Sequence, residues 1–333
     1  MQALKNKLRR MIPRRVMYLY YLLTATRAYM YDIKRRVHDK IYNDGEAVKV
    51  KRDLTVAYHI VEKGLTMPET RPGFGKQVII NLTNLVARYE KLGLNKDDVE
   101  FEQTISVLKE YQEFHKQIGH ILEEDISKRL NIIKEKYPNV TGIKQIRTTS
   151  ADFFQQVNEP FDRFCFSRYS VRNYTSQEIP LSVLERCVEL AMRSPSFCNR
   201  QPNRVYVVKS AEKKQGILEL QNGNRGFGHL AETLLVVTSV ISVTKDIHER
   251  HENHLNGGMF IMTLINALHF HKIGACSLNW SVSKTNDLKM RKLINIPENE
   301  VILLVISCGY LPDKLSIASS PRKPVKDICF VRN

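Results

Sequence analysis

The apolar positions in the first half of the chain repeat with helical spacing. In residues 52–63 they are Leu54, Ala57, Tyr58 and Val61, and Gly64 ends the pattern. Further helices are expected at 77–92 and 99–136, the second with a core stripe of Ile118, Leu122, Ile126, Leu130 and Ile133. Residues 1 to about 150 are therefore expected to form an all-helical extension. A polar stretch at 148–158 is the best candidate for a domain boundary.

The second half mixes strand and helix patterns. Runs of β-branched apolar residues at 204–209, 233–241 and 301–307 predict buried strands separated by helices. A long apolar helix is expected to open at Asn256-Gly257-Gly258. His269 and His271 come at its C-terminal turn, where a structural role is favoured over a catalytic one. Residues 151–333 are thus expected to form a second domain.

Positive charge is concentrated at the N-terminus. The chain of 333 residues has a formal net charge of +16, and residues 1–40 contain eleven Lys or Arg against two Asp. The apolar run at 16–23 is too short to span a bilayer. This basic arm is expected to rest on an anionic membrane surface or another protein, or to pack on its own domain. Nucleic acid is less favoured because no binding module accompanies the charge.

Composition describes an ordinary folded protein, with 43% hydrophobic and 26% charged residues. Six cysteines are widely separated, which favours reduced thiols in a cytoplasmic protein, with peripheral contact at the inner face of the membrane as an open alternative. Cys198 lies in a polar loop, and a bystander role is favoured over a redox role because one thiol lacks a partner.

Two polar clusters flank a short amphipathic helix within residues 166–208. Arg168, Ser170 and Arg172 alternate along an extended segment, so their side chains share one face. Two guanidinium groups and a hydroxyl on one face suit a compact anion such as phosphate. After Pro180 a helical pattern continues to Ala191, and Ser194-Pro195 then gives way to a polar loop at 196–202.

Together these clusters resemble the flavin-dependent nitroreductase family. The shared pattern is Arg168-x-Ser170-x-Arg172, then Ala191, then Pro195-Ser196-x-x-Asn199-x-Gln201-Pro202 before a strand. Arg-x-Ser-x-Arg alone is more often a solvated edge, so the order of the two motifs carries the resemblance. It covers about residues 160–333 and implies an α+β, three-layer fold whose central mixed or antiparallel sheet is flanked by helices.

The resemblance also implies a cofactor and a dimer. In this family the first motif holds the phosphate of flavin mononucleotide (FMN), and the loop motif approaches the flavin from the other subunit of a homodimer. The implied cofactor-binding residues are Arg168, Tyr169, Ser170, Arg172, Pro195, Ser196, Asn199, Gln201, Asn224, Leu278, Asn279, Trp280, Ser281 and Arg322. The segment that contains Leu278 to Ser281 differs from the small, Gly- or Pro-rich segment common in the family.

The extension adds a second candidate surface around its Gly- and Pro-rich turn. We expect His59, Glu62, Lys63, Arg71 and Lys76 to form a substrate-binding or lid surface, with capping and salt bridges as the alternative. One histidine and one glutamate are a poor ligand set, so no metal is expected.

The function implied by the resemblance is an FMN-dependent oxidoreductase. Such an enzyme passes hydride from NADH or NADPH to a small organic acceptor in a ping-pong reaction, and no side chain need act as a catalytic nucleophile. The alternative, of another class, is a flavin-binding regulatory or scaffold protein whose basic arm binds a membrane surface or a protein partner.

Overall fold

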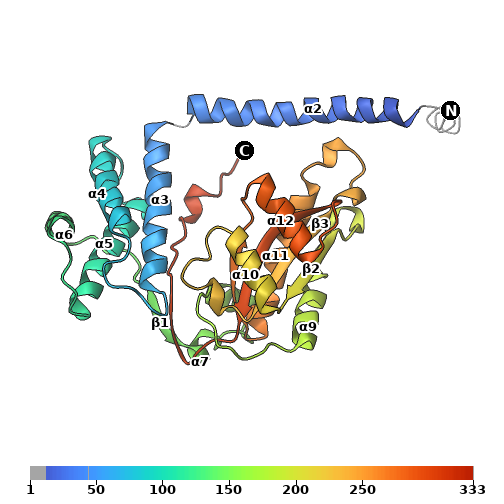
Figure 1. Cartoon of the computed structure of the whole chain (residues 1–333). Helices are drawn as coiled ribbons and strands as arrows, with labels where there is room; N and C mark the ends of the chain where they lie inside the picture. Colours follow the sequence, from blue (N-terminus) through green and yellow to red (C-terminus); the bar gives the residue numbers. More distant parts are fainter. Residues whose placement is uncertain (1–12, 44, 333) are drawn as a thin grey trace.

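The computed structural model describes residues 13–43 and 45–332. Figure 1 shows a group of helices packed beside a sheet-containing body, with one long helix, α2 (Arg14–His38), lying across the top. Residues 1–12 of the expected basic arm lie outside the described residues. Within the described part of the chain, no helix is both long enough and apolar enough to cross a membrane.

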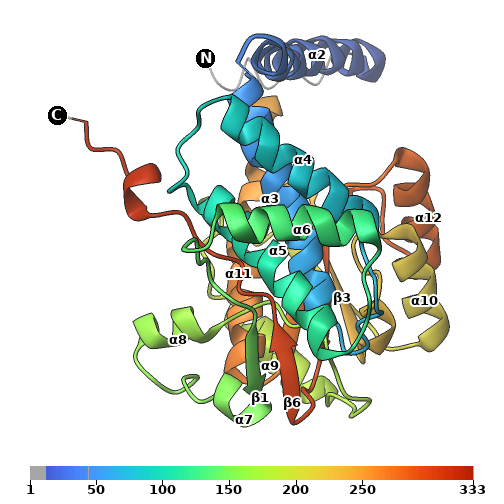
Figure 2. The same ribbon diagram turned by 90° about the vertical axis from the view of Figure 1, so that its left-hand side faces the viewer.

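The helical region comprises α3 (Glu46–Leu65), α4 (Lys76–Lys91), α5 (Val99–Gln117) and α6 (Glu124–Lys136), seen face-on in Figure 2. A short π-helical turn, Asp39–Asn43, follows α2. The apolar stripes of α3 to α6 meet in one core that includes Val50, Leu54, Ile79, Phe101 and Leu130. The helices predicted at 52–63 and 77–92 are confirmed as α3 and α4.

The helix predicted at 99–136 is wrong as a single element. It breaks into α5 and α6 at Gly119, whose φ of +67° is readily adopted only by glycine. Ile118 and Ile121 flank this break and are 45% and 91% exposed, so the predicted core stripe holds only beyond it. Ile126, Leu130 and Ile133 are buried as expected.

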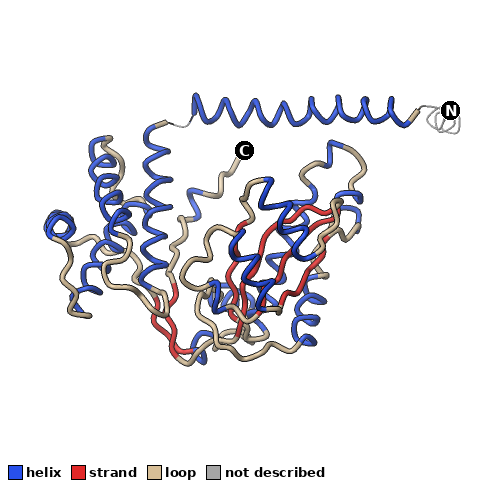
Figure 3. The backbone as a smooth tube through the Cα atoms, in the orientation of Figure 1, coloured by secondary structure: helices blue, strands red, loops and turns tan. Residues whose placement is uncertain are grey.

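The body contains a four-stranded antiparallel sheet in the order β2-β3-β5-β4. Its strands are β2 (Asn203–Val208), β3 (Thr233–Val240), β4 (Gly274–Asn279) and β5 (Glu300–Gly309). The strands predicted at 204–209, 233–241 and 301–307 are therefore confirmed, and Figure 3 shows them in red at the centre of the body.

Helices cover both faces of this sheet. One face packs on α9 (Leu181–Ala191) and α11 (Glu252–Phe270), with Leu235 and Ile306 pointing into that core. The other face packs on α10 (Ala211–Leu220) and α12 (Lys284–Ile294), with Leu234 and Val305 pointing there. The result is the expected α+β, three-layer fold. Helix α11 begins four residues before the expected Asn256.

The two regions are tied together by a second sheet and by a buried polar junction. Strand β1 (Ile146–Thr149) pairs with β6 (Lys314–Ile317), so one short strand lies inside the extension that was expected to be all-helical. Glu62 of α3 is fully buried and accepts a hydrogen bond from Gln103 Nε2 at 2.8 Å. Ser319 Oγ donates to the same carboxylate at 3.4 Å, which anchors the C-terminal segment along α3.

Short elements complete the body. Helices α7 (Ser150–Phe153) and α8 (Phe161–Ser167) lie between β1 and the Arg168 segment. The 3-10 turns are Phe197–Asn199, Gly228–Leu230, Ile241–Val243, Ile247–Glu249 and Val325–Asp327.

Candidate functional site

Arg168, Ser170 and Arg172 lie on an extended segment that follows α8. The backbone N–H of Val171 donates to the carbonyl of Ala275 at 3.0 Å, which fixes this segment beside the start of β4. Val171 is fully buried, whereas Arg168, Ser170 and Arg172 stay partly exposed. The predicted alternation therefore holds, and it directs both guanidinium groups away from the core.

Lys63 and Arg322 bring two more cations to the same place. Burial raises the pKa of the Cys276 thiol in β4, and the charges of Arg172, Lys63 and Arg168 oppose that rise. Burial lowers the pKa of Arg168, and the charge of Arg322 lowers it further. The charges of Lys63, Arg168 and Arg172 thus act on the same thiol, and the charge of Arg322 acts on Arg168. We call these four residues the cation cluster.

The cation cluster has no acidic counterpart. Among residues 13–43 and 45–332, no ion pair joins any of the four to a carboxylate. The pKa of Lys63 is lowered by burial and then by the charge of Arg172. Each positive charge in the cluster therefore makes the charged form of its neighbour less favourable. Lys63, Arg168 and Arg172 are partly buried, whereas Arg322 is exposed. Partly buried cations that lack an ion-pair partner are stabilised most directly by an anion. The residues present fit a phosphate group.

Neighbouring side chains hold the cluster in place. The Arg172 guanidinium lies 5.8 Å from the centre of the Phe227 ring. Arg322 donates to the carbonyl of Ser320, next to the anchored Ser319. Met67 packs against the body, and a Cβ placed on Gly226 would lie 3.2 Å from its sulfur, so the end of α3 fits closely against the loop before Phe227.

His269 of α11 contacts Ser167, the residue before Arg168. Its Nε2 is 2.8 Å from Ser167 Oγ, and its ring packs among Phe153, Phe154 and Phe164. Burial lowers its pKa to about 4, and the charge of Arg168 acts in the same direction. A neutral imidazole that is packed among aromatic rings supports the structural role expected from the sequence.

The loop at 195–201 is shaped by its own hydrogen bonds. Cys198, Asn199 and Gln201 have φ values of 49°, 54° and 49°, a left-handed conformation that is costly for residues other than glycine. Gln201 N donates to Ser196 Oγ at 3.0 Å, and Phe197 N donates to Oδ1 of Asn256, a buried residue, at 3.0 Å. Such strain at an exposed loop is typical of a binding segment. Pro195 lies at its exposed start.

The loop and the cation cluster lie at opposite ends of the sheet within one chain. Ala275, beside the cluster, pairs with Cys308 of β5. Asn203, directly after the loop, pairs with Ser239, which pairs with Val301 of β5. Positions 308 and 301 are seven residues apart, which corresponds to roughly 23 Å along a strand. The two motifs therefore cannot contact the same phosphate-bearing end of one ligand in a single chain.

The remaining residues expected near a flavin are distributed around β4. Leu278 is buried in the core, whereas Asn279 and Ser281 are exposed. Trp280 donates from Nε1 to Asp287 at 2.9 Å. Asn224 donates its amide to the carbonyls of Leu218 and Gln221, both at 2.8 Å, and so shapes its own loop. Tyr169 is partly buried against the core.

The five candidate residues of the extension do not gather in one place. Of these, Lys63 is the residue whose charge acts on Arg172. His59 Nδ1 lies 3.2 Å from Glu62, which faces the buried junction, while Lys76 pairs with Glu123 near α6. The side chain of Arg71 is exposed, and Phe74 of the turn packs on Tyr111 and His115.

Two cavities lie beside the extension. A cavity of about 480 Å³ is lined by Thr66, Met67 and Pro68 of the turn and by Asn173, next to Arg172. A larger one of about 1040 Å³ lies against α5 and the segment 138–147, and none of the predicted site residues lines it.

Sequence reasoning missed two residues that shape the site. Cys276 is the thiol on which the charges of Lys63, Arg168 and Arg172 act, and Ser319 anchors the segment that carries Arg322. Neither has a motif of its own. The contact of Ser319 with Glu62 joins residues 257 positions apart, which no local pattern encodes.

The model of the nitroreductase family matches residues 166–224, a stretch that contains both Arg168-x-Ser170-x-Arg172 and the loop at 195–201. Over this stretch the chain is therefore similar to the nitroreductase family. The matched stretch begins at the end of α8 and ends at Asn224, so it contains nine of the fourteen residues expected to bind the cofactor.

Similar proteins of known name fall into two groups. An iodotyrosine dehalogenase 1 homolog of Caenorhabditis elegans is 25% identical over 192 residues, which cover 48% of this chain and 58% of that protein. Iodotyrosine deiodinase 1 of Sus scrofa is 21% identical over 265 residues, covering 70% and 82%.

A solved nitroreductase-family protein from Streptococcus pneumoniae TIGR4 is 20% identical, with a TM-score of 0.45, covering 52% of this chain and all of that one. A protein from Exiguobacterium sibiricum 255-15, solved in complex with FMN, is 18% identical, with a TM-score of 0.46, covering 52% and 97%.

Proposed function

We propose that this chain is an FMN-dependent oxidoreductase that passes reducing equivalents from NADH or NADPH to a small organic acceptor. The observation that carries the proposal is the cation cluster, where four partly exposed cations meet without a carboxylate. The family match to the Arg168-x-Ser170-x-Arg172 segment supports FMN phosphate as the missing anion, and it supports an oxidoreductase at the level of the family.

Each residue of the cluster has a distinct part in binding. Arg168 and Arg172 offer planar guanidinium groups to phosphate oxygens, Ser170 adds a hydroxyl, and Arg322 closes the site from the C-terminal segment. When bound, FMN supplies the two-electron chemistry, because it accepts hydride from a reduced nicotinamide and passes it to a second substrate. The chain's own residues orient the cofactor and leave its reactive face accessible. No side chain is assigned a nucleophilic role.

We also propose a homodimer in which each FMN contacts both chains. The roughly 23 Å between the loop and the cluster along the sheet supports this, because a second chain must deliver Ser196, Asn199 and Gln201 to the cofactor. Mixed dimers test it directly. A cluster variant and a loop variant, each inactive alone, should regain activity when mixed, since one of the two shared sites is then intact.

We propose that residues 1–150 form the helical extension and 151–333 the FMN-binding domain. One buried cluster fills the first part and two others fill the second, which supports this division. A cytoplasmic location remains a prediction, as does peripheral contact of the N-terminal arm with a membrane.

The acceptor class is open to a direct screen. The screen should test a panel of acceptors that contains nitroaromatics and quinones. Halogenated tyrosines and phenols are added to it because some relatives are named iodotyrosine deiodinases. The cavity next to Asn173 and the nearby Lys63 favour an acceptor with an anionic or polar group. Steady-state rates at varied nicotinamide and acceptor should give the parallel double-reciprocal lines of a ping-pong reaction. Bound FMN without turnover of any acceptor would instead support a flavin-binding regulatory or scaffold protein.

A further inference from the structure

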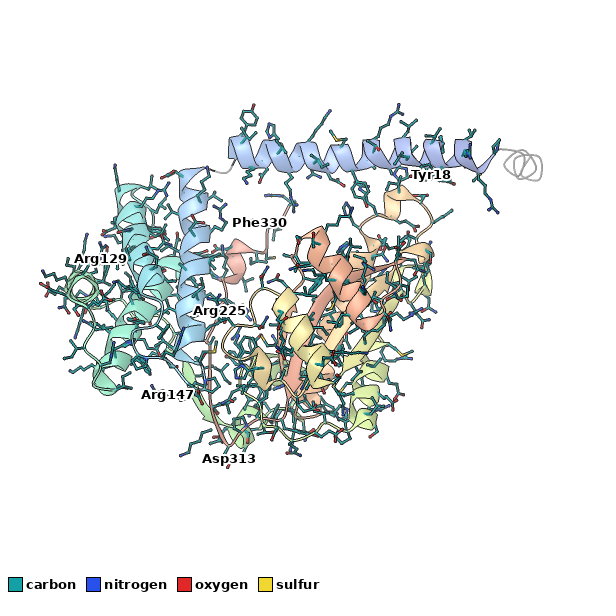
Figure 4. The ribbon with its side chains drawn as sticks, viewed as in Figure 1. Tyr18, Arg129, Arg147, Arg225, Asp313 and Phe330 are labelled. Carbon is teal, nitrogen blue, oxygen red and sulfur yellow. The ribbon has the colours of Figure 1, made fainter. Side chains whose placement is uncertain are left out.

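Helix α2 presents an apolar stripe that nothing in the described chain covers. Val16, Leu19, Leu23, Met30, Ile33 and Val37 are between 42% and 62% exposed. The helix has 25 residues and no buried side chain. Figure 4 shows its side chains standing clear along most of its length, with Tyr18 marking the N-terminal part.

The stripe points away from the protein body. The partly covered residues of α2 are Met17, Thr24, Ala25, Ala28 and Asp32, which fall on one side of the helix. On that side Asp32 binds Arg250 through two hydrogen bonds of 2.6 and 2.9 Å. At 100° per residue the stripe is centred opposite this side.

The spacing of the stripe is that of a coiled coil. Its members follow intervals of three and four residues, with Thr26 completing the series Val16, Leu19, Leu23, Thr26, Met30, Ile33, Val37. These are the a and d positions of three heptads. The Thr26 hydroxyl donates to the carbonyl of Leu22 at 2.8 Å, so its polar atom is already satisfied within the helix.

We propose that this stripe pairs with the same stripe of a second copy of the chain, in a parallel coiled coil. The flanking positions decide between orientations. In a parallel pair, Arg15 lies opposite Tyr20 of the second copy, and Lys34 lies opposite its Tyr29. Both contacts place a cation beside an aromatic ring, and no like charges face each other.

Antiparallel pairing is disfavoured by the same residues. One antiparallel register brings Arg15 against Arg36, and the other brings the two copies of Arg27 together. A membrane surface is the competing occupant, because exposed Leu22 and several exposed tyrosines widen the apolar surface beyond the stripe. The heptad spacing and the cation–aromatic contacts favour a second copy of the chain.

Disulfide cross-linking tests the proposal on the full-length, flavin-loaded protein. The exposed Cys165, Cys198 and Cys329 are replaced by serine, and Leu19→Cys is added at a d position, where parallel partners face themselves. Ala28→Cys on the body side is the matched control. Mild oxidation should join Leu19→Cys chains several-fold more completely than Ala28→Cys chains, and the further change Leu23→Lys should abolish this difference.

Three results would overturn the proposal. Equal cross-linking at Leu19→Cys and Ala28→Cys would show that the stripe does not pair. Cross-links that form only between Leu19→Cys and Met30→Cys chains would exclude the parallel orientation. The protein could instead sediment with phosphatidylcholine vesicles that contain phosphatidylserine, lose this binding on Leu23→Lys, and form no cross-links. That result would assign the stripe to a membrane surface. Circular dichroism of each variant separates all three from misfolding.

Discussion

Replacing Arg168 and Arg172 together by alanine should remove most of the phosphate contribution to FMN affinity. A charge-assisted hydrogen bond contributes about 1.5 to 3 kcal/mol, so two lost contacts give about 3 to 6 kcal/mol. Lys63 and Arg322 remain beside the phosphate and offset part of this loss, which favours the lower value. Because 1.4 kcal/mol corresponds to tenfold, we expect the Kd for FMN to rise by about a hundredfold or more.

Riboflavin makes this test specific, because it has the flavin ring without the phosphate. Isothermal titration should show that FMN binds the parent protein far more tightly than riboflavin, and that the double variant loses most of this preference. The flavin-free variant should melt no lower than the flavin-free parent, since removing two of four like charges relieves repulsion. The matched control is Arg186→Ala on α9 together with Arg193→Ala in the turn after it, which removes the same charge elsewhere. Equal losses for FMN and riboflavin would refute the phosphate assignment.

Three further predictions concern the surroundings of the site. His269 has a pKa of about 4 in the fold and about 6.5 when unfolded, so the unfolded chain binds a proton first as the pH falls below 6.5. The free energy of unfolding should therefore fall between pH 6.5 and pH 4, by up to about 3 kcal/mol. Denaturant melts should show this loss, and His269→Gln should make the free energy of unfolding less dependent on pH in this range. Glu62→Ala removes one of the buried acceptors of Gln103 Nε2 and should lower the free energy of unfolding by about 2 kcal/mol while weakening FMN binding. Glu62→Gln should retain more of both, and unchanged melts for Glu62→Ala would contradict this. Arg71→Ala should lower the rate with the preferred acceptor but leave FMN content and nicotinamide oxidation unchanged, and a loss of FMN would count against the turn as a substrate surface.

Local patterns predicted much of the fold. The strands β2, β3 and β5 follow from β-branched runs, and α3 and α4 follow from helical spacing. The break at Gly119 was missed because the apolar period continues across it, and only the left-handed φ reveals the turn. Strand β1 was missed because its four residues form a strand by pairing with β6, more than 160 residues later.

The site was predictable only in part for the same reason. The Arg168 motif and the loop motif are each local, and both have the geometry that their residues suggest. The meeting of Lys63 with Arg172 depends on how α3 docks against the loop that contains Gly226. Long-range packing of this kind has no local sequence signature. The sequence therefore did not show that Lys63 joins the cation cluster, whereas Lys76 pairs with Glu123.

The most direct test of the proposed function is the absorbance spectrum of the purified protein during anaerobic addition of NADH or NADPH. We expect a yellow protein whose flavin band bleaches with at least one nicotinamide and returns when a suitable acceptor is added. A folded protein that takes up no FMN, even after incubation with excess cofactor, would contradict the account.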